Sequence, residues 1–172
     1  NLAGMQPYTF SKQDEERENK WKIYKSIIQN FSEFYKNELF KNEKSHQAKN
    51  YLKERGLSGI DVKNFNLGFV TEDLDYYETL KKDFDESTIK ETGLFYFDEK
   101  RNKHISRFRN RIIFPINNIS GNIIGFGGRI IDDNKNLAKY INSPETPFFK
   151  KGSNLYNLDK ARKLSNKLED VY

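Results

Sequence analysis

Three arginines at alternating positions are the residues of this 172-residue chain best suited to bind phosphate: Arg107, Arg109 and Arg111. If their run is a β-strand, alternate side chains point to one face, and the three cations line up about 7 Å apart, at ~3.4 Å of rise per residue. That is roughly twice the ~3.4 Å between charges along one strand of duplex nucleic acid, so the row could follow a phosphate backbone. The alternative is a solvated strand face whose arginines pair with carboxylates.

A glycine-rich run, Gly125-Phe-Gly-Gly128, follows the arginines. Glycine weakens the interior of a strand, so several glycines together predict a bulge or a point where another backbone comes close. The run lacks the Gly-x-x-x-x-Gly-Lys-Ser/Thr order of phosphate-binding loops and the Gly-x-Gly-x-x-Gly order of dinucleotide-binding folds. By itself it therefore favours a structural bulge over a nucleotide site.

Both runs lie within a β-hairpin that we predict over residues 107–131. Residues 107–116 and 122–131 are rich in isoleucine and phenylalanine, and a polar segment containing Ser120-Gly121 separates them. Two such segments joined by turn residues are typical of paired strands. After the hairpin we expect a polar loop at 132–135 and an extended loop at 143–147, because each proline biases its predecessor away from helix.

The first half of the chain is predicted to be helical. Between residues 13 and 42 large apolar residues recur every three or four positions, which is typical of an amphipathic helix with its apolar stripe in the core. Ser11 and Asp14 resemble a capping box at its start. The stripe contains Trp21, Tyr24, Ile28, Phe31 and Tyr35.

Shorter elements complete the prediction. A second helix over about residues 45–55 ends at Gly56, a usual left-handed terminator. Residues 1–12 lack any period and are predicted to be a linker. We also expect short helices at 60–64, 75–84 and 87–92, short strands at 67–70 and 94–97, and a basic last helix at 159–168.

The composition of the chain limits the kinds of partner, metal site and cellular location that we expect. The net charge of +5, from 30 basic and 25 acidic residues, modestly favours a polyanionic partner. The chain has no cysteine, which excludes a disulfide framework and a cysteine-based zinc site, and two distant histidines cannot form a metal cluster alone. No apolar run approaches ~18 residues, so we expect a cytoplasmic protein without a membrane span. The start is not an initiator methionine, and we expect a piece of a larger protein.

The runs in the second half, taken together, resemble the bacterial DNA primases of the DnaG type. In that family Arg-Phe-Arg-x-Arg-Ile-x-Phe-Pro-Ile is followed by Gly-x-x-Ile-Gly-Phe-Gly-Gly-Arg, then by Lys-Tyr-x-Asn-Ser-Pro-Glu-Thr and Phe-x-Lys-Gly-x-x-Leu-Tyr. Upstream, Tyr51-Leu-Lys-Glu-Arg-Gly-Leu57 is similar to the family's Tyr-Leu-x-x-Arg-Gly-Leu. The other matching segments are Arg107 to Ile116, Gly121 to Arg129, Lys139 to Thr146 and Phe149 to Tyr156.

The resemblance implies where this chain lies in a longer protein. Residues 1–12 would be the linker from a zinc-binding domain, residues 13–168 the N-terminal subdomain of the RNA polymerase core, and residues 169–172 the start of a TOPRIM domain. The family's metal-binding acids, which hold magnesium or manganese, lie in the TOPRIM domain outside this sequence. We therefore expect no catalytic residue, no bound metal and no activity in this chain alone. The expected fold is α+β, with a helical first half followed by a bent, mostly antiparallel sheet that carries a basic groove.

The function implied by the resemblance is the synthesis of short RNA primers on a single-stranded DNA template at replication forks. The reaction is a nucleotidyl transfer in which two metal ions stabilise the attacking and leaving oxygens. Partners would be the template, ribonucleoside triphosphates, the RNA primer and, through a domain absent here, the replicative helicase. The residues expected to bind template or nucleotide are Arg107, Arg109, Arg111, Arg129, Lys139, Tyr140, Asn142 and Lys151.

Two other classes of function stay open from the sequence. One is a single-strand-binding module of another replication protein, in which a basic groove and aromatic side chains suffice and no polymerase chemistry follows. The other is a structural domain whose arginines pair with acids. A TOPRIM segment following residue 172 in the gene would separate the primase from the binding module.

Overall fold

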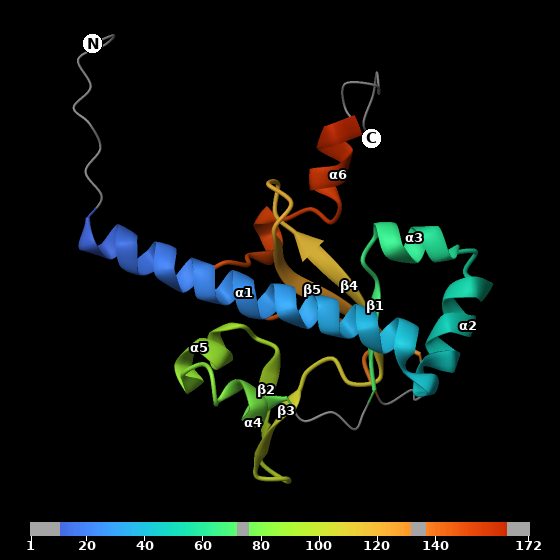
Figure 1. Ribbon diagram of the computed structural model, residues 1–172, viewed down its shortest axis with the longest axis horizontal. Coiled ribbons are helices and arrows are strands. Elements are labelled where there is room, and N and C mark those ends of the chain that lie inside the picture. Colours follow the sequence, from blue (N-terminus) through green and yellow to red (C-terminus); the bar gives the residue numbers. More distant parts are fainter. Residues whose placement is uncertain (1–10, 72–75, 132–136, 165–172) are drawn as a thin grey trace.

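The computed structural model describes residues 11–71, 76–131 and 137–164. Its longest element is the helix α1 (Lys12–Lys41), which crosses the front of the molecule from left to right in Figure 1. The predicted capping box is confirmed, because the Ser11 hydroxyl accepts from the backbone of Asp14 while the Asp14 carboxylate accepts from the backbone of Ser11. The predicted apolar stripe is buried at Tyr24, Ile28, Phe31 and Tyr35, and partly buried at Trp21.

A four-stranded antiparallel sheet forms the centre of the molecule. Its strand order is β1-β4-β5-β6, and the longest pairing joins β4 to β5. A register shift between Ile116 and Asn117 marks a bulge in β5, where Ile124 has no partner opposite it on β4. The strands are β1 (Gly68–Val70), β4 (Arg111–Asn117), β5 (Ile123–Ile130) and β6 (Tyr140–Asn142).

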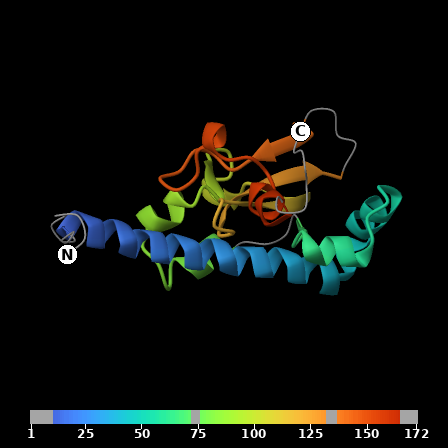
Figure 2. The same cartoon turned by 90° about the horizontal axis from the view of Figure 1, so that it is seen from above.

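Helix α1 covers one face of this sheet, as the view from above shows (Figure 2). The contact is close at Gly68, where an added Cβ would lie 2.6 Å from the Cβ of Tyr35 and 2.7 Å from its backbone carbonyl carbon. A larger residue would push the helix away. The core on this face contains Tyr24, Ile28, Phe31, Tyr35, Val70, Ile113 and Phe126.

The α-helices on the opposite face pack near β1 and the start of β4. There η1 (Glu43–Ser45), α2 (His46–Glu54) and α3 (Gly59–Asn64) pack over Phe69 and Ile112. Gly56, between the two helices, has φ +76°, so the predicted left-handed helix stop is confirmed. Toward β5 and β6, no α-helix of the described residues packs on this face, and a pocket remains there between the strands and the segment that follows β6.

A separate two-stranded antiparallel sheet lies below the main one in Figure 1. Its strands β2 (Phe95–Asp98) and β3 (Lys103–Ser106) follow α4 (Tyr77–Leu80) and α5 (Glu86–Glu91). The last described elements are η2 (Lys151–Ser153) and α6 (Leu158–Leu164). The predicted α+β class, with a helical first half and antiparallel sheets after it, is confirmed.

The predicted hairpin over residues 107–131 is wrong at its start. Residues 107–110 form a turn that joins β3 to β4, and β4 begins at Arg111. Asn110 lies in the turn with φ 53°, a left-handed conformation that asparagine tolerates better than most residues. The alternating arginine row therefore does not exist, because only one of its three members is in the strand.

Several predicted segments differ in extent or lie outside the described residues. The helix predicted over 75–84 is α4, which ends at Leu80, and the second helix is preceded by the 3-10 turn η1. The linker predicted over 1–12 is wrong at its end, because Ser11 caps α1 and Lys12 is the first residue of this helix, while residues 1–10 lie outside the described residues. The loop at 132–135, the end of the last helix at 165–168 and the start of a TOPRIM segment at 169–172 also lie outside the described residues.

Candidate nucleic-acid interface

A pocket of about 400 Å³ lies on the open face of the four-stranded sheet. Phe114, Gly127 and Asn142 form one row across β4, β5 and β6, because Gly127 pairs with both of the others. Gly127 has no side chain, which leaves space between its neighbours. An added Cβ would lie 3.1 Å from the Asn142 Oδ1 and 3.8 Å from the Phe114 Cβ. The loop after β6 closes the pocket with Phe149, Lys151, Asn154 and Tyr156.

Arg129 lies beside the pocket, between two tyrosines. Its guanidinium carbon is 4.0 Å from the centroid of the Tyr51 ring and 5.7 Å from that of Tyr140. Its Nε donates to the Tyr140 hydroxyl at 3.2 Å and its Nη1 donates to the Ile130 carbonyl at 3.0 Å. The residue is only 8% exposed. These contacts hold the planar guanidinium in one orientation, which suits two-point contact with a phosphate.

Tyr51 and Arg55 are members of this group that the sequence did not indicate as site residues. Tyr51 is on α2, Arg55 caps the same helix, and the Arg55 guanidinium carbon is 5.2 Å from the Tyr51 ring centroid. Their i, i+4 spacing places them on one side of the helix, and this was the available signal. Helix α2 thus adds a second cation to the edge of the open face.

Tyr140 and Lys139 are at the start of β6, next to Arg129. Tyr140 is 63% exposed, lines the pocket and pairs with Arg129 across the sheet. The Lys139 side chain is exposed, and its backbone carbonyl accepts from the Ile130 amide at 3.1 Å. The backbone around this pair is thus anchored to the sheet while both side chains face solvent.

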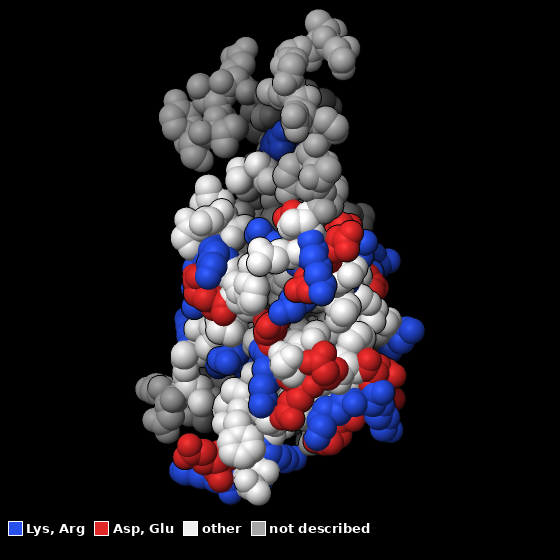
Figure 3. Space-filling view, turned by 90° about the vertical axis from the view of Figure 1, so that its left-hand side faces the viewer, with Lys and Arg blue, Asp and Glu red and all other residues white. Residues whose placement is uncertain are grey.

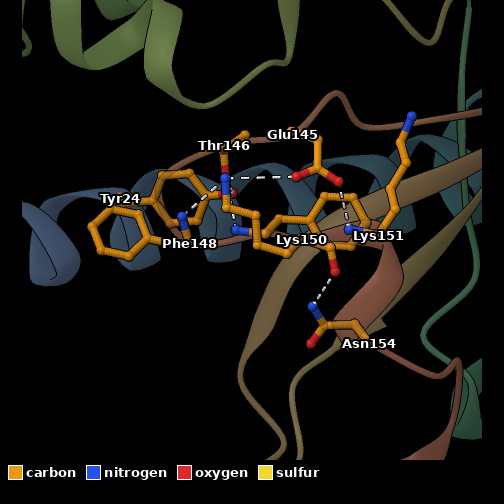
Figure 4. A network of polar contacts seen from close by, with 8 residues as sticks. Tyr24, Glu145, Thr146, Phe148, Lys150, Lys151 and Asn154 are labelled. Carbon is orange, nitrogen blue, oxygen red and sulfur yellow. Dashed lines mark hydrogen bonds and ion pairs between the residues drawn. The ribbon is translucent and has the colours of Figure 1, made fainter.

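The loop that carries Lys151 is tied down by a polar network (Figure 4). The Glu145 Oε1 accepts from the Lys151 amide at 2.8 Å, and the Glu145 Oε2 lies 3.6 Å from the Lys150 ammonium. The Thr146 hydroxyl accepts from the Phe149 amide at 2.9 Å and lies 3.3 Å from the Tyr24 hydroxyl. Glu145 therefore holds the backbone of Lys151, while the Lys151 side chain extends away from the network in Figure 4. Lys151 is one of the residues that line the pocket.

Arg111 does not belong to this site. It pairs with Ile130 in the sheet, whereas Arg129 pairs with Ile112, so Arg111 and Arg129 point to opposite faces. Arg111 is only 6% exposed, and its Nη1 donates to the Lys139 carbonyl at 3.4 Å. Burial lowers the pKa of the Arg111 guanidinium from its ordinary value. Its surroundings favour a structural role beneath β6, against the expectation from the sequence.

Arg107 and Arg109 lie on the turn before β4, beside the two-stranded sheet. The Arg107 Nε donates to the Gly93 carbonyl at 3.0 Å, and the Arg109 Nη2 lies 3.5 Å from the Tyr96 hydroxyl. Neither lines the pocket. Of the eight residues expected from the sequence, the structure brings together Arg129, Lys139, Tyr140, Asn142 and Lys151.

Other parts of the described chain offer less to a polyanion or a metal ion. At the end formed by the start of α1 and by α5, basic and acidic side chains are interspersed (Figure 3), with ion pairs such as Lys22–Glu18. Among the described residues, no three His, Cys, Asp or Glu side chains are grouped so that they could hold a metal ion. In the same ranges no helix has both the length and the apolar character needed to cross a membrane.

Comparison with known proteins identifies the family to which this chain belongs. Residues 34–162 match the family model of the DNA primase catalytic core, N-terminal domain. The chain belongs to the DNA primase family. It is 40% identical over 141 residues to the DNA primase of Staphylococcus aureus and 41% identical over 145 residues to that of Pseudomonas putida. Each match covers 81% of this chain and 23% or 21% of the relative, so the chain spans less than a quarter of these primases.

Solved primase structures have the same fold. A DnaG primase catalytic domain bound to single-stranded DNA superposes with a TM-score of 0.76 at 29% identity, covering 88% of this chain and 46% of that one. A DNA primase domain from Pseudomonas aeruginosa gives a TM-score of 0.73 at 39% identity, covering 86% and 46%. This primase chain therefore corresponds to somewhat less than half of a solved catalytic core.

Proposed function

We propose that this chain is the N-terminal part of the catalytic core of a DNA primase, an enzyme that makes short RNA primers on single-stranded DNA. In this proposal the open face of the main sheet binds the template strand and helps to position the incoming ribonucleoside triphosphate. The observation that carries the proposal is Arg129, fixed between Tyr51 and Tyr140 at the edge of a pocket of about 400 Å³.

The chemistry of the face suits an unpaired strand. Guanidinium and ammonium groups of Arg129, Lys139 and Lys151 can neutralise phosphates, and the exposed ring of Tyr140 can stack on a base of any sequence. Phe114 and Phe149 give the pocket an apolar wall against which a sugar or base can pack. Contacts to phosphate and to the face of a base carry little sequence information, so this face would accept many templates.

The remaining parts of the reaction would come from the longer protein. Magnesium or manganese ions bound by acids of a TOPRIM domain would stabilise the attacking and leaving oxygens of the nucleotidyl transfer. Among the described residues no three acids are grouped to hold such ions, and in this proposal these residues bind and orient the template and the nucleotide. In the longer protein we also propose a zinc-binding domain and a further domain that contacts the replicative helicase. We propose that this protein is located in the cytoplasm.

Replacement of Arg129 tests the proposed function. The chain should bind a single-stranded oligonucleotide with a Kd on the order of 10⁻⁴ to 10⁻⁶ M at physiological salt. Arg129→Ala should weaken binding roughly tenfold or more, because a hydrogen bond to a charged group contributes about 1.5–3 kcal/mol. Arg129→Lys should restore only part of the affinity, since an ammonium cannot make the two-point contact. Fluorescence anisotropy with a labelled oligonucleotide measures each constant.

Two further variants make the result specific. Arg101→Ala removes an exposed arginine that is paired with Asp98 at the tip of the β2–β3 hairpin, and it should leave affinity unchanged. Tyr140→Leu removes an exposed ring, so it should weaken binding without unfolding the chain. This variant tests the interface even if the Arg129 variants fail to fold. Wild-type affinity in both Arg129→Ala and Tyr140→Leu would refute the proposed interface.

A further inference from the structure

Helix α6 directly follows the segment that closes one side of the pocket. Asn154 and Tyr156 line the pocket, and α6 begins two residues after Tyr156, at Leu158. No residue of α6 belongs to the hydrophobic clusters found among the described residues. Within the part of the chain that the structure describes, the position of α6 therefore depends on polar contacts, and two neighbouring side chains make them.

Lys160 joins α6 to the end of α3. Its Nζ donates to the Asn64 carbonyl at 2.6 Å and lies 4.0 Å from the centroid of the Phe65 ring. Asn64 is the last residue of α3, where carbonyl groups without a partner inside the helix attract a cation. Burial lowers the pKa of the Lys160 ammonium from its ordinary value, as expected for a cation withdrawn from water. This contact joins residues 96 positions apart in the sequence.

Asp159 joins α6 to the main sheet. It is only 5% exposed, and its Oδ2 accepts from the Asn117 Nδ2 at 3.0 Å. Asn117 is the last residue of β4 and follows Ile116, which lines the pocket. An added Cβ at Gly121 would lie 3.8 Å from the same carboxylate oxygen, so Asp159 also lies against the turn between β4 and β5. Asp159 and Lys160 thus fix the start of α6 at two separate points.

The position of α6 sets the position of one side of the pocket, because the two are contiguous in the chain. Burial raises the pKa of the Tyr156 hydroxyl, and the Asp159 carboxylate is near enough to raise it further. If α6 left its place, Asn154 and Tyr156 would move with it. Phe114 and Gly127 would stay, since strand pairing holds them.

We propose that Asp159 and Lys160 are positioning residues, which dock α6 and thereby keep the last two pocket-lining residues in place. In this proposal neither side chain contacts the ligand. The inference rests on the proposed function for the identity of that ligand, a single-stranded nucleic acid. Because only the docked form presents the complete pocket, the apparent Kd rises in proportion as the docked fraction falls.

Lys160→Met tests the inference in the 172-residue chain, with the labelled oligonucleotide that tests Arg129. The substitution keeps an unbranched side chain and removes the hydrogen bond to the Asn64 carbonyl. If the docked fraction falls to about one fifth, the Kd should rise about fivefold. Lys160→Arg can still donate to the carbonyl and lie over the Phe65 ring, so it should restore binding.

Lys163→Met is the matched control, because Lys163 is an exposed lysine on the same helix. It removes the same charge and leaves the contact between Lys160 and α3 intact, so the Kd should stay that of the wild type. Melting curves followed by circular dichroism confirm that each variant is folded. An equal loss of affinity in Lys160→Met and Lys163→Met would mean that only the charge matters, and would overturn the inference.

Tyr156→Leu decides whether Lys160 acts through the pocket. In a chain that already carries Tyr156→Leu, Lys160→Met should weaken binding less than it does alone, because a residue that the docked helix positions has been removed. Effects of residues that act through one another are not additive, whereas those of independent sites are. Fully additive losses would contradict the proposed role.

Spin labels measure the docking itself, without any ligand. The chain has no cysteine, so labels can be attached through Lys63→Cys on α3 and Lys163→Cys on α6. Electron paramagnetic resonance should give a narrow range of distances between the labels, and Lys160→Met should broaden it. An unchanged range overturns the inference. If Lys160→Met does not alter binding while Arg129→Ala weakens it, only this inference fails, and if neither variant has an effect, the proposed function fails as well.

Discussion

Arg111 and Arg129 show how an offset of one position in strand pairing decides to which face of the sheet an arginine points. They are on neighbouring strands, but Arg111 is opposite Ile130 and Arg129 is opposite Ile112. Because side chains alternate between the faces of a sheet, this offset sends Arg111 beneath β6 and Arg129 to the open face. The first then bonds a backbone carbonyl in the interior, and the second lies between two tyrosine rings beside the pocket.

Gly68→Ala should destabilise the chain by about 1–3 kcal/mol, the usual cost of overpacking. The added methyl would overlap the Cβ and the backbone of Tyr35, and backbone cannot move aside as a flexible side chain can. Urea denaturation followed by circular dichroism measures the free energy of unfolding.

Gly59→Ala is the matched change, since Gly59 begins α3 and an added Cβ there meets nothing within 4 Å. It should stabilise the chain by about 0.4–1 kcal/mol by reducing the freedom of the unfolded state. Similar effects of the two substitutions would show that the contact between α1 and β1 is looser than the structure indicates.

At the scale of elements, the stability of a short helix depends on the hydrogen bonds that cap its first turn. Helix α5 has six residues and is capped by Asp85, whose carboxylate accepts from the Ser87 and Thr88 hydroxyls and from the Thr88 amide. These hydrogen bonds hold the pKa of the Asp85 carboxyl well below its ordinary value of 3.8. Helix α5 packs against α1 and β2, so its cap affects the support of the two-stranded sheet.

Asp85 should make the stability of the chain depend on pH at the acid end. Because its pKa is lower in the folded state, the cap stabilises fully above the unfolded value of 3.8, and this contribution is lost as the pH falls through the folded pKa. Asp85→Asn keeps a good N-cap without an ionising group, so it should match wild type near neutral pH and decline less on acidification. Melting temperatures across the acid range test this, and parallel curves for the two proteins would contradict it.

At the scale of the whole molecule, the charged side chains differ in whether they are paired. The chain has a net charge of +5, yet the end formed by α1 and α5 mixes acids with bases, and many lysines there pair with glutamates. The cations of the open face, such as Lys151, have no such partners in the described residues. Local arrangement, more than net charge, should therefore govern binding to nucleic acid.

The dependence of binding on salt tests that expectation. Replacing Arg129, Lys139 and Lys151 by Ala should flatten the slope of log K against log salt by roughly 2, at ~0.7 for each lost contact with a single strand. Replacing Lys22, Lys36 and Lys90, which pair with glutamates on α1 and α5, removes the same charge and should leave the slope unchanged. An equal effect of both sets would mean that net charge alone drives binding.

The sequence by itself determined the helices and helix ends that depend on residues close together in the chain. The period of α1, the capping box at Ser11 and the left-handed stop at Gly56 each depend on residues within one or two turns of helix, so they could be predicted and are confirmed. The motif runs likewise indicated the family and most residues of the open face. The start of β4 was missed because residues 107–116 alternate like one continuous strand, whereas Asn110 adopts a left-handed conformation that ends a turn just before Arg111.

Only the tertiary structure decided which of these residues act together. The face to which an arginine points depends on where its strand begins and on its pairing partner, and neither is encoded in the arginine run itself. Tyr51 reaches Arg129 because α2 packs over β1 and β4, and Lys151 reaches the pocket because Glu145 holds its backbone. Contacts between residues far apart in sequence carry no local period, so the composition of the site became visible only in the folded chain.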